Sequence, residues 1–239
     1  SGTRRGGLGP VAGSTEPRCG VGAVRCAALG VGGSAALIRW WEADIDAGTK
    51  RTQGRPLPSG RMTASSARDV GVAWSAGSVV IMGLAIGLLP AAILAGSIFY
   101  YAWIYTVWLK PRTPQNIVIG GGAGAFPPVI GWVAVTGHVG LDPAGLMPIL
   151  LFLIIFFWTP PHFWALAIRY RDDYAAADVP MLPSVVSLHE TAVRILIYTV
   201  FVWFLTVLFI PVGHMGWIYG VIAFLFGGVF PWLAAQLPR

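Results

Sequence analysis

Residues 146–168 read LMPILLFLIIFFWTPPHFWALAI, a stretch of 23 residues without a charged side chain. About 20 apolar residues are needed for a helix to cross the hydrocarbon core of a bilayer. The stretch therefore predicts a membrane-spanning helix. It belongs to a longer interval, between Arg112 and Arg169, in which Asp142 carries the only charge.

Two further intervals contain no charged residue. They comprise 40 residues between Asp69 and Lys110, and 44 residues between Arg194 and Arg239. Each interval is long enough for two spans, and Gly and Pro near its middle indicate a turn. The sequence thus predicts an all-α, polytopic transmembrane helical bundle with six complete spans, at residues 70–87, 91–109, 117–136, 146–168, 193–210 and 216–235. Pro127 and Pro128 are expected to kink or break the third span.

The composition supports a membrane protein. Hydrophobic residues form 56% of the 239 residues and charged residues only 11%, whereas soluble domains contain about 25% charged residues. These values exclude an ordinary soluble enzyme, a disordered chain and a coiled coil. The net charge of +6 fits loops that face anionic lipid, so we expect the lipid bilayer as a partner and no nucleic acid.

Lys and Arg gather in loops that the predicted spans place at one face. Each charge-free interval crosses the membrane and returns, so the loops at 39–69, 110–116 and 169–194 share a side. The three opposite turns contain neither Lys nor Arg. By the positive-inside rule, the charged loops are expected to be cytoplasmic.

The first 33 residues do not fit this plan, because they contain ten glycines and four arginines but no long apolar run. We expect residues 1–33 to be an aberrant or disordered segment that reflects a frame error or a truncation. Residues 26–38 are apolar but too short to span alone, and would be a partial span. An incomplete transmembrane domain would then occupy residues 34–239.

Acidic residues form two clusters on the charged face. Glu42 and Asp46 are four residues apart and would share one face of a helix, whereas Asp172 and Asp173 follow the fourth span. Carboxylates suit Mg²⁺ that is shared with substrate phosphates, and the loop at 110–116 adds cations. The two clusters together predict metal-assisted handling of a diphosphate. The alternative is a pair of solvated loops that only set the topology.

His162 lies inside the fourth predicted span. Ionisable residues within a membrane are candidates for function. Two interpretations remain open from the sequence, a hydrogen-bonded core histidine and a ligand of haem iron.

Three segments carry a family resemblance. They are WWEADIDAGTKRTQGRPLPSGR at 40–61, YTVWLKPRTPQNIVIGGGAGAFPPVIGW at 105–132, and WTPPHFWALAIRYRDDYAAADVPMLP at 158–183. With the apolar helices that follow, the chain resembles the UbiA-type intramembrane prenyltransferases over roughly residues 40–230. Within this family it is most similar to the branch of the protohaem IX farnesyltransferases, or haem O synthases.

The resemblance implies transfer of a farnesyl group from farnesyl diphosphate to a vinyl group of the substrate haem b, with Mg²⁺ as cofactor, in the cell inner membrane. It further implies a haem–copper oxidase assembly or haem A synthase as partners. The implied metal ligands are Glu42, Asp46, Asp172 and Asp173, and the implied diphosphate-binding residues are Arg51, Arg55, Lys110, Arg112 and Asn116. Asp46, Asp173 and Lys110 would be catalytic, and His162 would contact haem. The alternatives are a UbiA-type enzyme with a different aromatic acceptor, and a non-enzymatic membrane protein such as a transporter.

Overall fold

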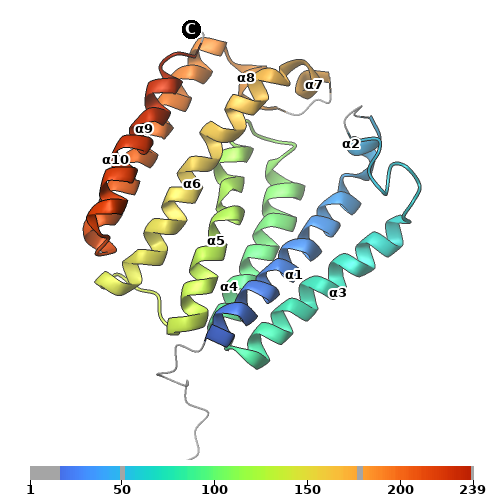
Figure 1. Ribbon diagram of the computed structural model, residues 1–239. Helices are drawn as coiled ribbons and strands as arrows, with labels where there is room; N and C mark the ends of the chain where they lie inside the picture. Colours follow the sequence, from blue (N-terminus) through green and yellow to red (C-terminus); the bar gives the residue numbers. More distant parts are fainter. Residues whose placement is uncertain (1–16, 49–51, 177–179, 238–239) are drawn as a thin grey trace, which may run out of the picture.

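The computed structural model describes residues 17–48, 52–176 and 180–237, and these residues form helices and connecting turns without a strand (Figure 1). The predicted all-α helical bundle is therefore confirmed. The long helices are α1 (Pro17–Trp41), α3 (Ala64–Ala85), α4 (Leu88–Phe99), η1 (Tyr100–Leu109), α5 (Asn116–Thr136), α6 (Pro143–Arg169), α9 (Leu188–Val212) and α10 (Trp217–Ala234). Three short helices lie between them: α2 (Ala43–Gly48), α7 (Arg171–Ala176) and α8 (Leu182–Val185).

Six helical segments are long and apolar enough to cross a membrane. They are Gly20–Trp41, Leu88–Leu109, Asn116–Thr136, Ala144–Arg169, Leu188–Val212 and Trp217–Ala234. The number agrees with the sequence prediction, and five of the six segments overlap predicted spans. The sixth segment, Gly20–Trp41 in α1, was not predicted as a complete span, and the predicted span at residues 70–87 is not among the six. Helix α3 covers that region, but its first turns include the charged residues Arg68 and Asp69.

Disorder is wrong for residues 17–33, and so is the expectation that residues 26–38 form only a partial span. These residues belong to α1, a helix of 25 residues. In the sequence, the glycines of this segment argued against a span. Several of them instead lie close to neighbouring helices, where a larger side chain would not fit. Residues 1–16 lie outside the described part of the chain.

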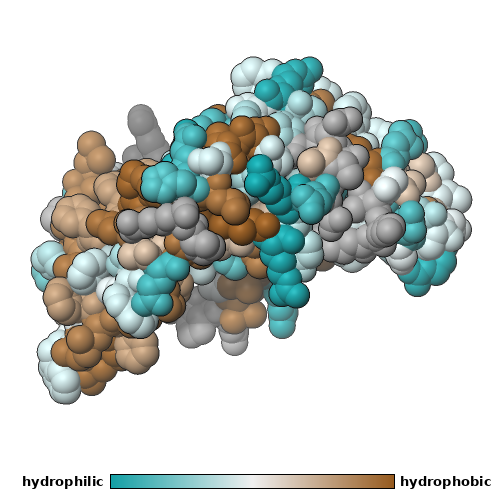
Figure 2. Space-filling view, turned by 90° about the horizontal axis from the view of Figure 1, so that it is seen from above, coloured by the Kyte–Doolittle hydropathy of each residue, from teal (hydrophilic) through white to brown (hydrophobic). Residues whose placement is uncertain are grey.

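The helices pack as a row in which each contacts its neighbours. Helices α1, α3, α4 and α5 contact one another on one side, and α6, α9 and α10 follow α5 in that order on the other side (Figure 1). The short helices α2, α7 and α8 all lie at the same end of the bundle, together with the C-terminus (Figure 1). Seen from this end, hydrophilic side chains are concentrated over the middle and right of the face (Figure 2). The charged loops thus share one end of the bundle, as the sequence predicted.

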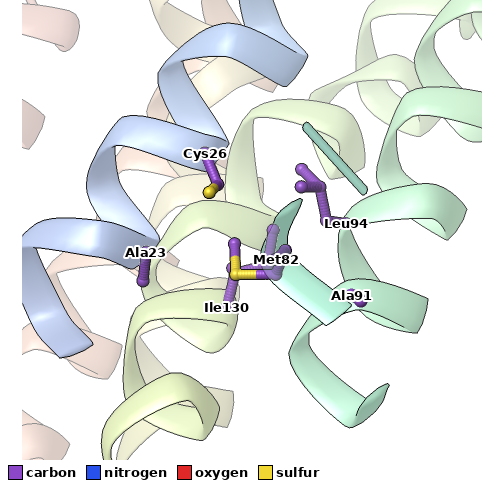
Figure 3. Packing of buried hydrophobic residues seen from close by; sticks show 6 residues of the cluster. All are labelled: Ala23, Cys26, Met82, Ala91, Leu94 and Ile130. Atoms are coloured by element: carbon purple, nitrogen blue, oxygen red, sulfur yellow. The ribbon is translucent and has the colours of Figure 1, made fainter. Parts of the chain in front are cut away.

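A cluster of small and sulfur-containing side chains joins α1, α3, α4 and α5. Met82 is completely buried and lies among Ala23, Cys26, Leu94 and Ile130 (Figure 3). In contrast, many large apolar residues elsewhere are exposed, including Leu84 at 86% and Trp217 at 79%. This pattern is expected where lipid replaces water around the helices.

The contact between α1 and α3 brings the two helix backbones close together. A Cβ atom added to Gly33 would lie 2.5 Å from Ser75 Oγ and 2.7 Å from the Ser75 backbone nitrogen. A Cβ added to Gly71 would lie 2.8 Å from Leu37 Cγ. Small residues allow such close approach in membranes, where packing drives helix association.

Helix α5 is not broken by its two prolines, contrary to one of the two outcomes expected from the sequence. It continues from Asn116 to Thr136 with Pro127 and Pro128 inside. Helices α4 and α6 pack against it, and packed neighbours help a helix in lipid to accommodate the backbone groups that proline leaves unpaired.

The turn before α6 lies at the end opposite the charged loops. The Asp142 side chain accepts a hydrogen bond from the Gly145 backbone and caps the helix, and His138 Nε2 lies 2.6 Å from Asp142 Oδ1. Two hydrogen bonds lower the pKa of the Asp142 carboxyl. The larger effect comes from the bond with His138 and the smaller from the bond with Gly145. This polar pair fits a turn at the membrane surface.

The close packing of α1 on α3 predicts that Gly33→Ala destabilises the protein. The added methyl group would meet the backbone of α3, and overpacking of this kind costs about 1–3 kcal/mol. Thermal unfolding in detergent should therefore show a lower midpoint for Gly33→Ala. The matched control is Gly77→Ala in α3, where an added Cβ has no atom within 4 Å. Equal midpoints for the two variants would contradict this account of the interface.

Candidate functional site

A charged pocket lies at the end of the bundle that carries the polar loops. It has a volume of about 380 Å³ and is formed by the last turns of α1, by α2, by η1 and by the beginning of α5. Further lining residues come from α6, α7 and the segment before α8. Its polar members are Arg39, Glu42, Asp46, Thr52, Arg55, Tyr101, Tyr105, Lys110, Asn116, Tyr170 and Tyr174.

Two buried carboxylates in this pocket are each paired with a cation. Glu42 is 7% exposed and Asp46 is 6% exposed. Lys110 Nζ donates to Glu42 Oε1 over 2.5 Å, and Arg55 Nη1 donates to both carboxylate oxygens of Asp46 over 2.7 and 2.8 Å. The repulsion that the spacing of Glu42 and Asp46 predicts is therefore offset by two cations, one nearby in sequence and one 68 residues away.

The loop after α2 contacts Asp46 through two of its side chains. The Thr52 hydroxyl donates to the Asp46 carbonyl oxygen over 2.7 Å, and the side chain of Arg55 reaches the Asp46 carboxylate three residues later. The polar loop thereby folds back on the helix that precedes it. This explains how a segment without long regular structure holds a cation inside the pocket.

Asn116 begins α5 and is 1% exposed. Its Nδ2 donates to the Lys110 carbonyl oxygen over 3.2 Å. The carbonyl group can only accept, so the amide orientation is determined and Oδ1 faces away without a hydrogen-bond partner. Asn116 therefore supports the backbone of Lys110 through one of its two amide N–H donors.

Tyrosines form one wall of the pocket. Tyr101 and Tyr105 from η1 stack with their ring centroids 5.7 Å apart, and Tyr174 comes from α7. Electron-rich aromatic faces attract cations. The wall combines with the ion pairs to give a pocket that can hold an anionic group beside a developing carbocation.

The remaining residues that the sequence nominated divide into two groups. Asp172 is exposed and does not line the pocket. Arg112 is also exposed, and it donates to the carbonyl oxygens of Val107 and Trp108 at the end of η1. Arg51 and the side chain of Asp173 lie outside the described part of the structure.

His162 lines a second cavity, which we call the apolar groove. The groove has a volume of about 500 Å³ and lies among α6, α9 and α10. His162 contacts the ring of Trp158 with a centroid distance of 5.0 Å, and Phe230 also contacts Trp158. The next residue, Phe163, lines the charged pocket, so adjacent positions on α6 reach the two cavities.

Within the described residues, no three His, Cys, Asp or Glu side chains come together as a ready metal site. Glu42 and Asp46 nevertheless offer hard oxygen ligands in one buried pocket. Mg²⁺ commonly uses one or two carboxylates and completes its shell with water and substrate phosphates. The donor set therefore fits Mg²⁺ bound together with a phosphate-bearing substrate.

Several pocket residues were not found from the sequence. Arg39 was assigned only to a charged loop, and Tyr101, Tyr105, Tyr170 and Tyr174 were treated as ordinary span or loop residues. Their spacing could have been informative, because Tyr101 and Tyr105 precede Lys110 by nine and five residues. That spacing does not match one face of an α-helix.

The fold and the pocket define a polytopic membrane protein with a charged pocket at one end of its helical bundle. The family model of the UbiA prenyltransferase family matches residues 11–239. The chain therefore belongs to the UbiA prenyltransferase family.

Curated relatives show high identity over most of the chain. A protein of Novosphingobium aromaticivorans and one of Erythrobacter litoralis, both named protoheme IX farnesyltransferase, are each 57% identical over 231 residues. These alignments cover 97% of this chain and 74% of each relative. A protein of Rhizorhabdus wittichii with the same name is 52% identical over 224 residues, which cover 94% of this chain and 72% of the relative. No solved structure matches significantly.

Proposed function

We propose that this prenyltransferase joins the farnesyl group of farnesyl diphosphate to a vinyl group of haem b and yields haem O and diphosphate. Two findings support the proposal, the names of its curated relatives and the charged pocket. The observation that carries it is the presence of Glu42 and Asp46, each beside its own cation, at the end of a membrane bundle.

The charged pocket would bind the diphosphate. Lys110 and Arg55 are suited to the terminal oxygens, because charge-assisted hydrogen bonds from cations to phosphate are strong. Mg²⁺, when held by Glu42 and Asp46 with the help of Asp172 and Asp173, would neutralise charge on the leaving diphosphate. Arg51 and Arg112 remain proposed contributors from the surrounding loops.

Asn116 has a different proposed role from the direct diphosphate contact that the family resemblance implied. One of its amide N–H donors is bonded to the Lys110 carbonyl oxygen, so it would position Lys110. The lone Oδ1 would accept a hydrogen bond from water at the bound diphosphate.

The reaction breaks the bond between the allylic carbon and the diphosphate oxygen, and the electron pair leaves with diphosphate. The tyrosine wall would stabilise the allylic cation. The vinyl π electrons then form the new carbon–carbon bond, water adds to the resulting cation, and one proton is released. The sum is farnesyl diphosphate, haem b and water on one side, and haem O and diphosphate on the other.

The apolar groove is the proposed site of haem b, with His162 facing the iron. A neutral imidazole is a common iron ligand, and the groove is bounded by apolar and aromatic residues of three helices. The vinyl edge of the porphyrin would have to reach the charged pocket past Phe163. The product would be passed to a haem–copper oxidase or to haem A synthase.

Two alternatives remain useful as outcomes of the tests. A different aromatic acceptor would retain the charged pocket but would not require His162. A transporter would need polar residues along a path through the helices, whereas the buried acidic residues here gather at one end.

The carboxylates in the charged pocket predict a loss of turnover in Asp46→Asn. The amide keeps the shape but loses the negative charge that holds a hard cation, and Arg55 loses its partner. Activity with farnesyl diphosphate, haem b and Mg²⁺, followed by mass spectrometry of the haem, should fall at least about 100-fold, the size of effect seen when a transition-state contact is removed. Asp173→Asn should act in the same direction.

The control is Glu190→Gln, because the pair of Glu190 and Arg194 is an exposed ion pair at the same end of the bundle. It should retain activity. Normal turnover of Asp46→Asn at limiting Mg²⁺ would refute the proposed mechanism on these residues. Turnover of another aromatic acceptor, with none of haem b, would favour the first alternative.

The proposed haem site predicts that His162→Ala weakens haem b binding about tenfold, or about 1.4 kcal/mol, while affinity for farnesyl diphosphate stays the same. The imidazole is far from charged partners in an apolar groove, so its loss should affect the iron rather than the diphosphate. Titration monitored by the haem absorption spectrum measures the effect. His189→Ala, at an exposed position in α9, is the control, and equal haem affinity in all three proteins would leave His162 a packing role.

The charged loops are proposed to face the cytoplasm of a bacterial cell, and the bundle to lie in the inner membrane. Reporter fusions within residues 52–63 should therefore be active only as cytoplasmic reporters, whereas fusions beside Asp142 should report the opposite side. The physical reason is the attraction of Lys and Arg to the cytoplasmic leaflet. Fusions that report the same side at both positions would contradict the helix order.

A further inference from the structure

The segment η1, Tyr100–Leu109, is a π-helix of ten residues that continues α4. The Lys110 backbone N–H donates to the Tyr105 carbonyl oxygen over 2.9 Å, five residues back. A π-helix is rare, and single turns of it are frequent at functional sites. A run of this length at the edge of the charged pocket therefore requires an explanation.

The wide turn divides the side chains of η1 into two faces with the same spacing. Phe99, Trp103 and Trp108 are 58%, 57% and 58% exposed and form the outer face. Tyr101, Tyr105 and Lys110 line the charged pocket. In both sets the residues are separated by four and then five positions, as expected from hydrogen bonds between residues i and i+5.

An α-helix would not produce these faces. At 3.6 residues per turn, each residue turns the helix by about 100°, so Lys110 would lie about 140° around the axis from Tyr105. A π-helix turns by only about 80° per residue, and the same two residues are then about 40° apart. The π-helix thus brings Lys110 to the face that holds Tyr105 and lets it reach Glu42.

One side chain bonds across this wide turn. Thr106 is 3% exposed, and its hydroxyl donates to the Tyr101 carbonyl oxygen over 2.9 Å. This bond spans five residues, whereas Thr206 in the regular helix α9 donates to Val202, four residues back. Thr106 therefore adds a side-chain hydrogen bond to a carbonyl group of the π-helix at the five-residue spacing of that helix.

The neighbouring helix accommodates the same arrangement. A Cβ atom added to Gly120 of α5 would overlap the ring of Tyr105, so glycine leaves room for that ring. At the end of η1, Asn116 donates to the carbonyl oxygen of Lys110. The position of Lys110 is therefore supported from α5, in addition to the Thr106 hydrogen bond within η1.

We propose that Thr106 is a positioning residue that stabilises the π-helix Tyr100–Leu109, and that this helix directs Lys110 into the charged pocket to pair with Glu42. The part of this inference that concerns the diphosphate rests on the proposed function. The pairing of Lys110 with Glu42 does not depend on it.

A carbodiimide cross-linking experiment tests the pairing without substrate. The reagent activates the Glu42 carboxylate, the Lys110 amine forms an amide with it, and the reagent leaves as its urea. Mass spectrometry of the digested protein then measures the peptide pair that contains both residues. The wild-type protein in detergent should give this product.

Thr106→Val keeps the shape of the side chain but removes the donor, so the cross-link yield should fall at least threefold. Thr106→Ala should behave in the same way, and Thr106→Ser should restore the yield because it keeps the hydroxyl. Thr206→Val removes a comparable hydrogen bond in α9 and should not change the yield. Wild-type yield in Thr106→Val and Thr106→Ala would overturn the proposal, as would failure of both variants to elute as folded protein in size-exclusion chromatography.

A second arm separates this proposal from the proposed function. Inorganic pyrophosphate with Mg²⁺ should lower the wild-type cross-link yield, because it competes with Glu42 for Lys110. Thr106→Val should also raise the KM for farnesyl diphosphate more than it lowers kcat. If pyrophosphate has no effect while Thr106→Val still loses the cross-link, the positioning role stands and the diphosphate site is wrong.

Discussion

The free-energy cost of burying charged side chains inside a membrane protein constrains the rest of this structure. Glu42 and Asp46 are both buried, and an unpaired carboxylate in such a place is strongly unfavourable. Lys110 and Arg55 offset this cost, but they can do so only if the end of α1, the loop after α2 and the end of η1 meet. Because a buried pair is weak evidence for net stability, the pairs are better understood as constraints on geometry. They require elements from three parts of the chain to enclose one pocket.

The interior of the bundle shows how the helices come close enough to build that pocket. Helices α1 and α3 meet through Gly33 and Gly71, and Gly120 admits the ring of Tyr105. Lipid supplies no hydrophobic driving force between apolar helices, so close packing has to supply much of the association energy. Glycine in these spans thus allows close contact between helices and is not there to make the backbone flexible. The same property made the sequence of α1 look unlike a span.

Much of the fold was predictable because hydrophobicity and charge report directly on the bilayer. The intervals without charge located five of the six spans, and the confinement of Lys and Arg to alternate loops placed Glu42, Asp46, Arg55 and Lys110 at one end. The rest depended on contacts that no single segment contains. The glycine-rich start of α1 becomes a helix against α3, and α5 runs through two prolines because neighbours pack around it. The tyrosine wall was missed because Tyr101 and Tyr105 were treated as ordinary span residues, and Tyr174 joins them only through the tertiary fold.

Under the proposed function, the two cavities would let one helix serve two substrates of different chemistry. Phe163 reaches the charged pocket and His162 reaches the apolar groove, because adjacent residues on a helix point about 100° apart. An ionic substrate group and an apolar ring would therefore be held on different faces of α6, and neither site would have to tolerate the other's environment. On the other side of the charged pocket, the π-helix determines which of its side chains face the pocket. It turns a single cation toward the acidic residues while its tryptophans remain toward lipid, which a regular α-helix of the same sequence would not do.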